Sequence, residues 1–116
     1  MMQLDIQTNG FSITEGIRHY TTQRMQFALD RNDGQIIHAR VSLADINGPR
    51  GGIDKRCQIN LALVGQNNIV IEDTEADLYV AIDRASGRCE RTLVRRLERL
   101  RQHSHDSATI KLADEE

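Results

Sequence analysis

The chain has 116 residues, which is enough for one domain with one hydrophobic core. Its composition, 39% hydrophobic and 28% charged, predicts a packed globular fold rather than disorder. Aromatic residues make up only 3% and tryptophan is absent, which argues against a binding mode that stacks unpaired bases over several exposed rings. Because the formal net charge is −2, any surface for nucleic acid must come from an uneven distribution of charge.

The cysteines and the N-terminus indicate an ordinary intracellular protein. Cys57 and Cys89 lie within regular apolar patterns and lack the close spacing of a metal knuckle, so we expect two buried thiols and no metal site. No basic stretch precedes an apolar core at the N-terminus, and no segment approaches the roughly 18 apolar residues of a membrane span. We therefore expect a cytoplasmic protein that makes no membrane contact.

The first part of the chain predicts a strand followed by a helix. Residues 3–8 alternate between polar and apolar side chains, as in a strand with one buried face, and Asn9-Gly10 breaks the pattern. A segment with helical spacing then runs to about residue 29, and Ser12 or Thr14 is able to cap its start. We expect residues 31–34 to end this helix, because Asn, Asp and Gly tolerate left-handed backbone angles.

Three more strands are predicted between residues 37 and 73. In the first two, apolar residues alternate with polar ones, which indicates long strands that each bury one face. The side chains expected in the core are Ile37, Ala39, Val41 and Leu43 of the first strand and Cys57, Ile59, Leu61 and Leu63 of the second. Residues 65–68 make a tight connection to a short strand over residues 69–73, so the three strands form a meander.

The last helix is predicted over residues 75–102, with Thr74 and Asp77 in the outline of a capping box at its start. Its apolar residues fall on one face, which is expected to pack on the sheet. They are Leu78, Ile82, Ala85, Cys89, Leu93, Leu97 and Leu100. Residues 103–116 lack periodicity and end in acidic residues, so we expect a flexible acidic tail there.

The element order β-α-β-β-β-α predicts an α+β fold. We expect a two-layer sandwich in which a four-stranded, mostly antiparallel sheet carries two helices on one face, as in double-stranded RNA-binding domains. Residues 1–102 are predicted to form this single domain, followed by the tail.

A stripe of arginines on the last helix is the strongest functional signal. Its members are Arg84, Arg88, Arg91, Arg95 and Arg99, all well separated from the apolar face. They repeat every 5 to 6 Å, roughly the spacing of phosphates along a nucleic acid, and each guanidinium can hold two phosphate oxygens. The alternative is a solvated face paired with Glu90 and Glu98. However, two acids cannot pair all seven arginines between residues 84 and 101.

The loop over residues 46–54 contains three glycines and the chain's single proline, with Arg50 at its tip and Lys55 directly after it. Its backbone could approach a ligand closely. No Gly-Lys-Ser/Thr sequence ends it, so it is not a P-loop. Two interpretations stay open, a hairpin tip that contacts phosphate and a plain wide turn between strands.

The sequence gives little support to an enzyme, a cofactor or a small-molecule substrate. The four histidines are scattered, and the two that are close, His103 and His105, lie in the predicted tail. The aspartates lie at strand and helix ends, where this residue is common in turns and caps, and no nucleophile has a partner base. We expect binding without catalysis.

Two segments carry a resemblance to a known family. Residues 13–20 and above all residues 72–83, which contain the run Asp-Leu-Tyr-Val-Ala-Ile-Asp before the arginine-rich helix, are similar to the short form of the ribosome hibernation-promoting factor family, also called ribosome-associated inhibitor A. The similarity covers about residues 3–101 and implies the same β-α-β-β-β-α fold.

This resemblance implies a monomeric protein that lodges in the decoding region of the small ribosomal subunit, contacts ribosomal RNA and blocks messenger and transfer RNA. On this hypothesis the RNA contacts come from the arginine stripe together with Arg50, Lys55, Arg18 and Arg24. The alternative is a protein-interaction module without ribosome binding, in which the sheet or the acidic residues 72–83 meet a protein partner.

Overall fold

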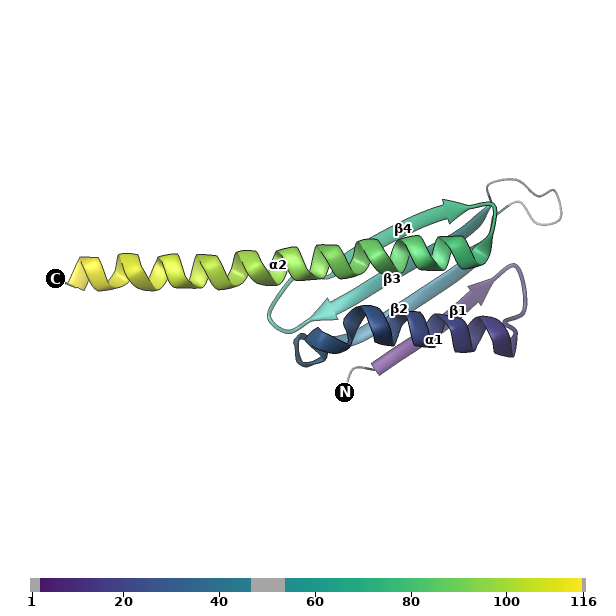
Figure 1. Cartoon of the computed structure of the whole chain (residues 1–116), viewed down its shortest axis with the longest axis horizontal. Coiled ribbons are helices and arrows are strands. Elements are labelled where there is room, and N and C mark those ends of the chain that lie inside the picture. The colour runs from purple at the N-terminus through teal and green to yellow at the C-terminus, as the bar shows by residue number, and fades with distance from the viewer. Residues whose placement is uncertain (1–2, 47–53, 116) are drawn as a thin grey trace.

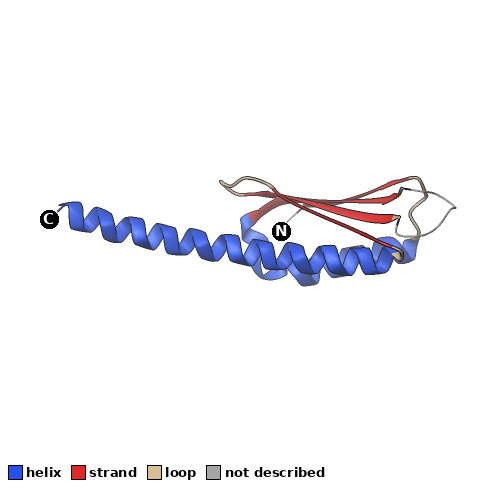
Figure 2. Cartoon of the chain, turned by 90° about the horizontal axis from the view of Figure 1, so that it is seen from above, coloured by secondary structure: helices blue, strands red, loops and turns tan. Residues whose placement is uncertain are grey.

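The computed structural model describes residues 3–46 and 54–115, and the side chains of these residues up to Gln102. Two layers make up the domain, a sheet and a pair of helices that lie together on one of its faces (Figures 1 and 2). The elements are β1 (Gln3–Asn9), α1 (Glu15–Leu29), the 3-10 helix η1 (Asp30–Gln35), β2 (Ile36–Asp45), β3 (Lys55–Leu63), β4 (Ile69–Glu75) and α2 (Leu78–Glu115).

The sheet has four strands in the order β1-β2-β3-β4. β1 pairs with β2 in parallel, whereas β2 with β3 and β3 with β4 are antiparallel. β1 and β4 are therefore the edge strands. The predicted α+β class and element order are confirmed, including the mostly antiparallel sheet with both helices on one face.

α1 begins as the sequence predicts and ends differently. Thr14 caps the start, because its Oγ1 accepts a hydrogen bond from Ile17 N at 3.1 Å. At the other end the chain tightens into η1, which keeps a negative φ of −116° at Asn32. Positive φ angles occur among the described residues only at Gly10 and Gly65, so the predicted left-handed helix end over residues 31–34 is wrong.

One predicted core residue, Ile37, is wrong because β2 contains a bulge near its start. The pairing register of β2 with β3 shifts between Ile36 and His38. As a result Ile36 is buried, whereas Ile37, expected in the core, is 58% exposed. From Ala39 to Leu43 buried residues alternate with more exposed ones, because no further residue is inserted into the pair.

The predicted capping box of Thr74 and Asp77 does not form at the junction between β4 and α2. β4 continues to Glu75, so Thr74 lies within the strand. Asp77 caps α2 alone, since its Oδ1 accepts a hydrogen bond from Tyr79 N at 2.9 Å and its backbone O accepts one from Ala81 N at 3.0 Å. The helix therefore begins at Leu78, three residues later than predicted.

α2 is also longer than predicted, because its backbone stays helical to Glu115 instead of ending near Gln102. No Gly or Pro follows Gly87 in the sequence, so no residue of the type that ends a helix interrupts it. Figure 1 shows the second half of α2 extending beyond the sheet as a free rod.

The core lies between the sheet and the two helices. Its fully buried large side chains include Met25 and Leu29 of α1, Ile59 and Leu61 of β3, and Leu93 of α2. Cys57 and Cys89 are buried free thiols, as predicted, and burial raises the pKa of each to about 12. Leu93 is the last residue of α2, among those with described side chains, that is completely buried.

The Asp77 cap gives a first testable prediction. Asp77→Ala is expected to lower the free energy of unfolding by about 0.5–2 kcal/mol, because Tyr79 N loses its side-chain acceptor. Urea denaturation followed by circular dichroism measures this change. Asp77→Asn is the control, since an amide oxygen still accepts the bond; an equal loss in both variants would contradict the capping role.

Candidate nucleic-acid interface

The arginine stripe lies on the outer side of α2, where the helix passes along the edge strand β4. Leu78, Ile82, Ala85, Cys89 and Leu93 turn toward the sheet and are buried or partly buried, which leaves the arginines facing outward. All five stripe residues are exposed. The stripe is nevertheless not uniform, because its two ends have different neighbours.

Carboxylates of β4 pair with the first two arginines of the stripe. Arg84 Nε lies 3.8 Å from Glu75 Oε2, and Arg88 Nη1 lies 3.5 Å from Asp73 Oδ2. Arg88 Nη1 also donates to the backbone O of Glu72 at 2.9 Å. The acids of β4 also influence each other. The pKa of Glu75 is raised, mainly because of its hydrogen bond with Asp73. The positive charge at this end of the stripe is thus largely offset.

The following part of α2 keeps its charge. Arg91, Arg95, Arg99 and Arg101 are exposed and make no ion pair or hydrogen bond with a residue whose side chain the structure describes. Arg96 Nη1 donates to the backbone O of Asn67 at 2.6 Å, which leaves its charge without a counterion. We call residues 90–101 the basic segment; its five arginines and two glutamates give it a formal charge of +3.

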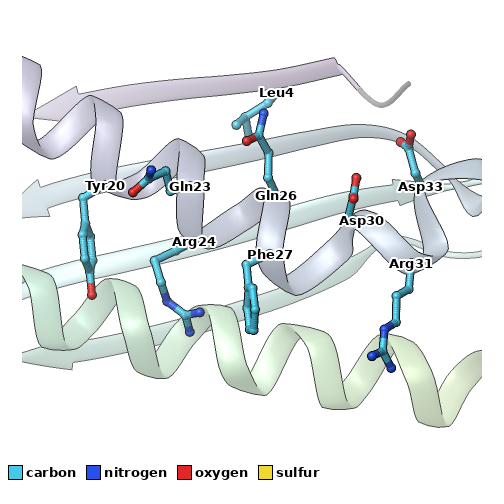
Figure 3. Close-up of a pocket in the computed structure, with 9 residues that line it drawn as sticks. All are labelled: Leu4, Tyr20, Gln23, Arg24, Gln26, Phe27, Asp30, Arg31 and Asp33. Atoms are coloured by element: carbon cyan, nitrogen blue, oxygen red, sulfur yellow. The ribbon is translucent and has the colours of Figure 1, made fainter.

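A hollow in the described surface runs along α1 and η1 (Figure 3). All of its lining residues except Leu4 belong to one stretch, residues 20–33, so it is an open depression along a helix. Among the described residues no three His, Cys, Asp or Glu side chains are grouped as a metal would require. No described helix is long and apolar enough to cross a membrane.

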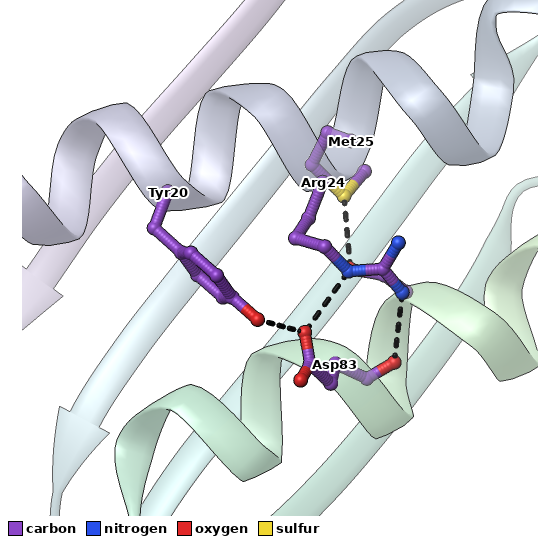
Figure 4. Close-up of polar contacts among 5 residues, drawn as sticks. Tyr20, Arg24, Met25 and Asp83 are labelled. Atoms are coloured by element: carbon purple, nitrogen blue, oxygen red, sulfur yellow. Dashed lines mark hydrogen bonds and ion pairs between the residues drawn. The ribbon is translucent and has the colours of Figure 1, made fainter.

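Arg24, one of the predicted RNA contacts, instead links the two helices. Its Nε lies 2.9 Å from Asp83 Oδ1, and its Nη2 donates to the backbone O of Asp83 at 3.4 Å (Figure 4). Tyr20 donates its hydroxyl to the same Oδ1, and this bond raises the pKa of Tyr20. The ring of Tyr20 also meets Tyr79 edge to face, with centroids 4.9 Å apart. Arg24 is therefore committed to a contact between α1 and α2.

The other predicted contacts lie apart from the basic segment. Lys55 is held at the base of the 46–54 loop, with its Nζ 3.0 Å from Asp54 Oδ1 and 3.2 Å from Asp45 Oδ2, and the bond to Asp54 is the main cause that raises its pKa. Arg18 is exposed and has no partner in the described part of the chain. Arg50 lies outside the described residues, so both interpretations of its loop stay predictions.

The fold and the basic segment together define a small α+β binding domain with two helices over a mixed sheet. Residues 4–101 match the family described as Sigma 54 modulation protein / S30EA ribosomal protein, and the chain belongs to this family. It is a family of ribosome-associated proteins, and the resemblance to the hibernation-promoting factors is confirmed.

Two solved structures are similar to the chain. The N-terminal domain of Protein Y from Thermus thermophilus is 30% identical, with a TM-score of 0.67 over 82% of this chain and 98% of that one. A ribosomal subunit interface protein from Coxiella burnetii is 17% identical, with a TM-score of 0.68 over 84% of this chain and 99% of that one, and supports the fold alone. No curated protein gives a significant match.

Proposed function

We propose that the protein is a cytoplasmic translation inhibitor that binds ribosomal RNA of the small subunit in the decoding region, blocks messenger and transfer RNA, and so keeps idle ribosomes silent. It acts as a monomer and by binding alone, without catalysis. Membership of a ribosome-associated family supports the target. The observation that carries the RNA contact is the basic segment of α2: Arg91, Arg95, Arg99 and Arg101 are exposed, and none of its arginines has an acidic partner among the described side chains.

The geometry of the basic segment suits a phosphate backbone. Arg91, Arg95 and Arg99 follow one another at intervals of four residues, which places a guanidinium about every 6 Å along the helix. Each can bind a phosphate through two parallel hydrogen bonds. Because phosphate contacts do not read base identity, recognition would come from the shape of a folded RNA.

A net charge of −2 does not oppose this function, because the acids of β4 and Asp77 lie toward the start of α2 and the two glutamates within the basic segment are outnumbered by its five arginines. The carboxylates of β4 cluster near the start of α2, next to Asp77. From Asp77 to Arg95 the helix rises by about 27 Å at 1.5 Å per residue. This is well beyond the Debye length of roughly 8 Å at physiological salt, so RNA near the basic segment would experience its local positive charge.

Salt dependence tests the proposal directly. Co-sedimentation with purified small subunits is expected to weaken by roughly 10- to 100-fold between about 50 and 200 mM salt, because three to five phosphate contacts release a matching number of counterions. Binding constants over a salt series give the slope. An affinity that hardly changes with salt would contradict RNA binding and favour the protein-interaction alternative.

A further inference from the structure

Aromatic and arginine side chains alternate on the side of α1 that faces α2. Tyr20, Arg24 and Phe27 follow at intervals of four and three residues and so share one side of α1, and Arg31 comes four residues after Phe27, in η1. Figure 3 shows the side chains of Tyr20, Arg24 and Phe27 leaving α1, and that of Arg31 leaving η1, toward the side on which α2 lies. Since both helices cover the same face of the sheet, these side chains belong to the same layer as the basic segment.

Phe27 is unusual because its ring is 76% exposed. Within α1, which is described throughout, it is the one exposed large hydrophobic side chain. A protein partner generally needs a contiguous apolar patch, and Phe27 is instead flanked by Arg24 and Arg31. A single ring between two guanidinium groups matches a nucleotide, whose planar base stacks on a ring while its phosphate meets a cation.

The two arginines beside Phe27 differ in whether their guanidinium groups already have partners. The Arg24 guanidinium carbon lies 5.8 Å from the centre of the Phe27 ring, and its bonds to Asp83 hold it there. Arg31, one turn farther on, is exposed and has no ion pair or hydrogen bond with a described residue. Arg24 therefore steadies the ring through a cation-π contact, while the cation of Arg31 is free to bind a ligand.

We propose that Phe27 stacks on one unpaired base of the bound RNA and that Arg31 binds the adjoining phosphate. This inference rests on the proposed function and adds a second contact surface to it, on α1. A single base is expected, because the rings of Tyr20 and Tyr79 are engaged with each other. Base stacking on one ring changes affinity by roughly 5- to 150-fold.

The test compares variants of the full chain in binding to purified small subunits over a salt series. Phe27→Ala is expected to weaken binding by about 10-fold at every salt concentration, since stacking releases no counterions, and Phe27→Tyr keeps wild-type affinity. Arg31→Gln is expected to flatten the salt slope by about one, as the loss of one phosphate contact should. Because the ring of Phe27 is exposed, its variants are expected to fold as the wild-type protein does, and thermal unfolding of each variant checks this.

The variant Phe27→Leu distinguishes between an RNA base and a protein surface as the partner of Phe27. A leucine retains an apolar contact with a protein but offers no flat ring, so it should behave like Phe27→Ala. Wild-type affinity in Phe27→Ala, or full binding by Phe27→Leu, overturns the inference and leaves the proposed function in place. Absence of binding by the wild-type protein itself overturns both.

Discussion

Replacing Arg91, Arg95 and Arg99 with glutamine is expected to lower the affinity for small ribosomal subunits on the order of 100-fold at about 0.1 M salt. The three side chains belong to the basic segment and lack partners among the described residues, so their loss removes ligand contacts and breaks no internal one. With three fewer phosphate contacts the salt slope should also fall by about two to three. Equilibrium co-sedimentation over a salt series measures both quantities.

A charge-matched variant is the control for this experiment. The three arginine substitutions take the formal net charge from −2 to −5. Changing the exposed residues Gln7, Asn9 and Gln35 to Glu, Asp and Glu gives the same total, and all three lie outside α1 and α2. If this control lost as much affinity as the arginine variant, overall charge would explain the effect and the basic segment would not be the contact.

Arg84 and Arg88 are left unchanged in that design because the structure gives them internal partners. The guanidinium groups of these ion pairs with Glu75 and Asp73 are exposed and the N–O distances are long, so each pair contributes little to stability by itself. Substitution would nonetheless leave acids crowded along β4 without cations, and a binding defect could then arise from a disturbed strand.

Leu93→Ala should have the largest effect on stability, lowering the free energy of unfolding by about 2–5 kcal/mol. Leu93 is completely buried and packs in the core at the point where α2 starts to leave the sheet. A domain of this size is stable by about 5–15 kcal/mol, so the loss is a large fraction of the total. Urea denaturation followed by circular dichroism measures it as a lower midpoint with an unchanged slope.

The neighbouring Val94 is the matched control for Leu93. Val94 is 37% exposed and lies outside the core cluster, so Val94→Ala is expected to change the free energy of unfolding by less than about 1 kcal/mol. Similar losses in both variants would show that this part of α2 is not anchored through Leu93.

Periodicity predicted most of the fold because each element buries one face. Alternating residues placed the first three strands, and the spacing of Ile82, Cys89 and Leu93 placed the buried side of α2. Element ends were less predictable, since they depend on local hydrogen bonds. Asp77 caps α2 by itself, and the bulge at Ile37 shifts the register in a way that an uninterrupted alternation cannot reveal.

The sequence predicted where the candidate interface lies, but not which of its arginines keep their charge without an acidic partner. Helical spacing showed that the arginines share one outer face, yet it could not show which of them meet acids from other elements. Asp73 and Glu75 lie on β4, and only the fold brings them to Arg88 and Arg84. Phe27 was missed because helical spacing alone does not show which apolar residues of α1 stay exposed.

The contacts of Arg88 and Arg96 with backbone oxygens have a consequence for self-association. β4 is an edge strand, and such edges expose carbonyl groups on which another polypeptide can extend the sheet. Here Arg88 occupies the carbonyl of Glu72, and Arg96 occupies that of Asn67 just before the strand. An added strand would have to displace both side chains. The two contacts of α2 therefore oppose extension of the sheet at this edge, while the other arginines of α2 point outward.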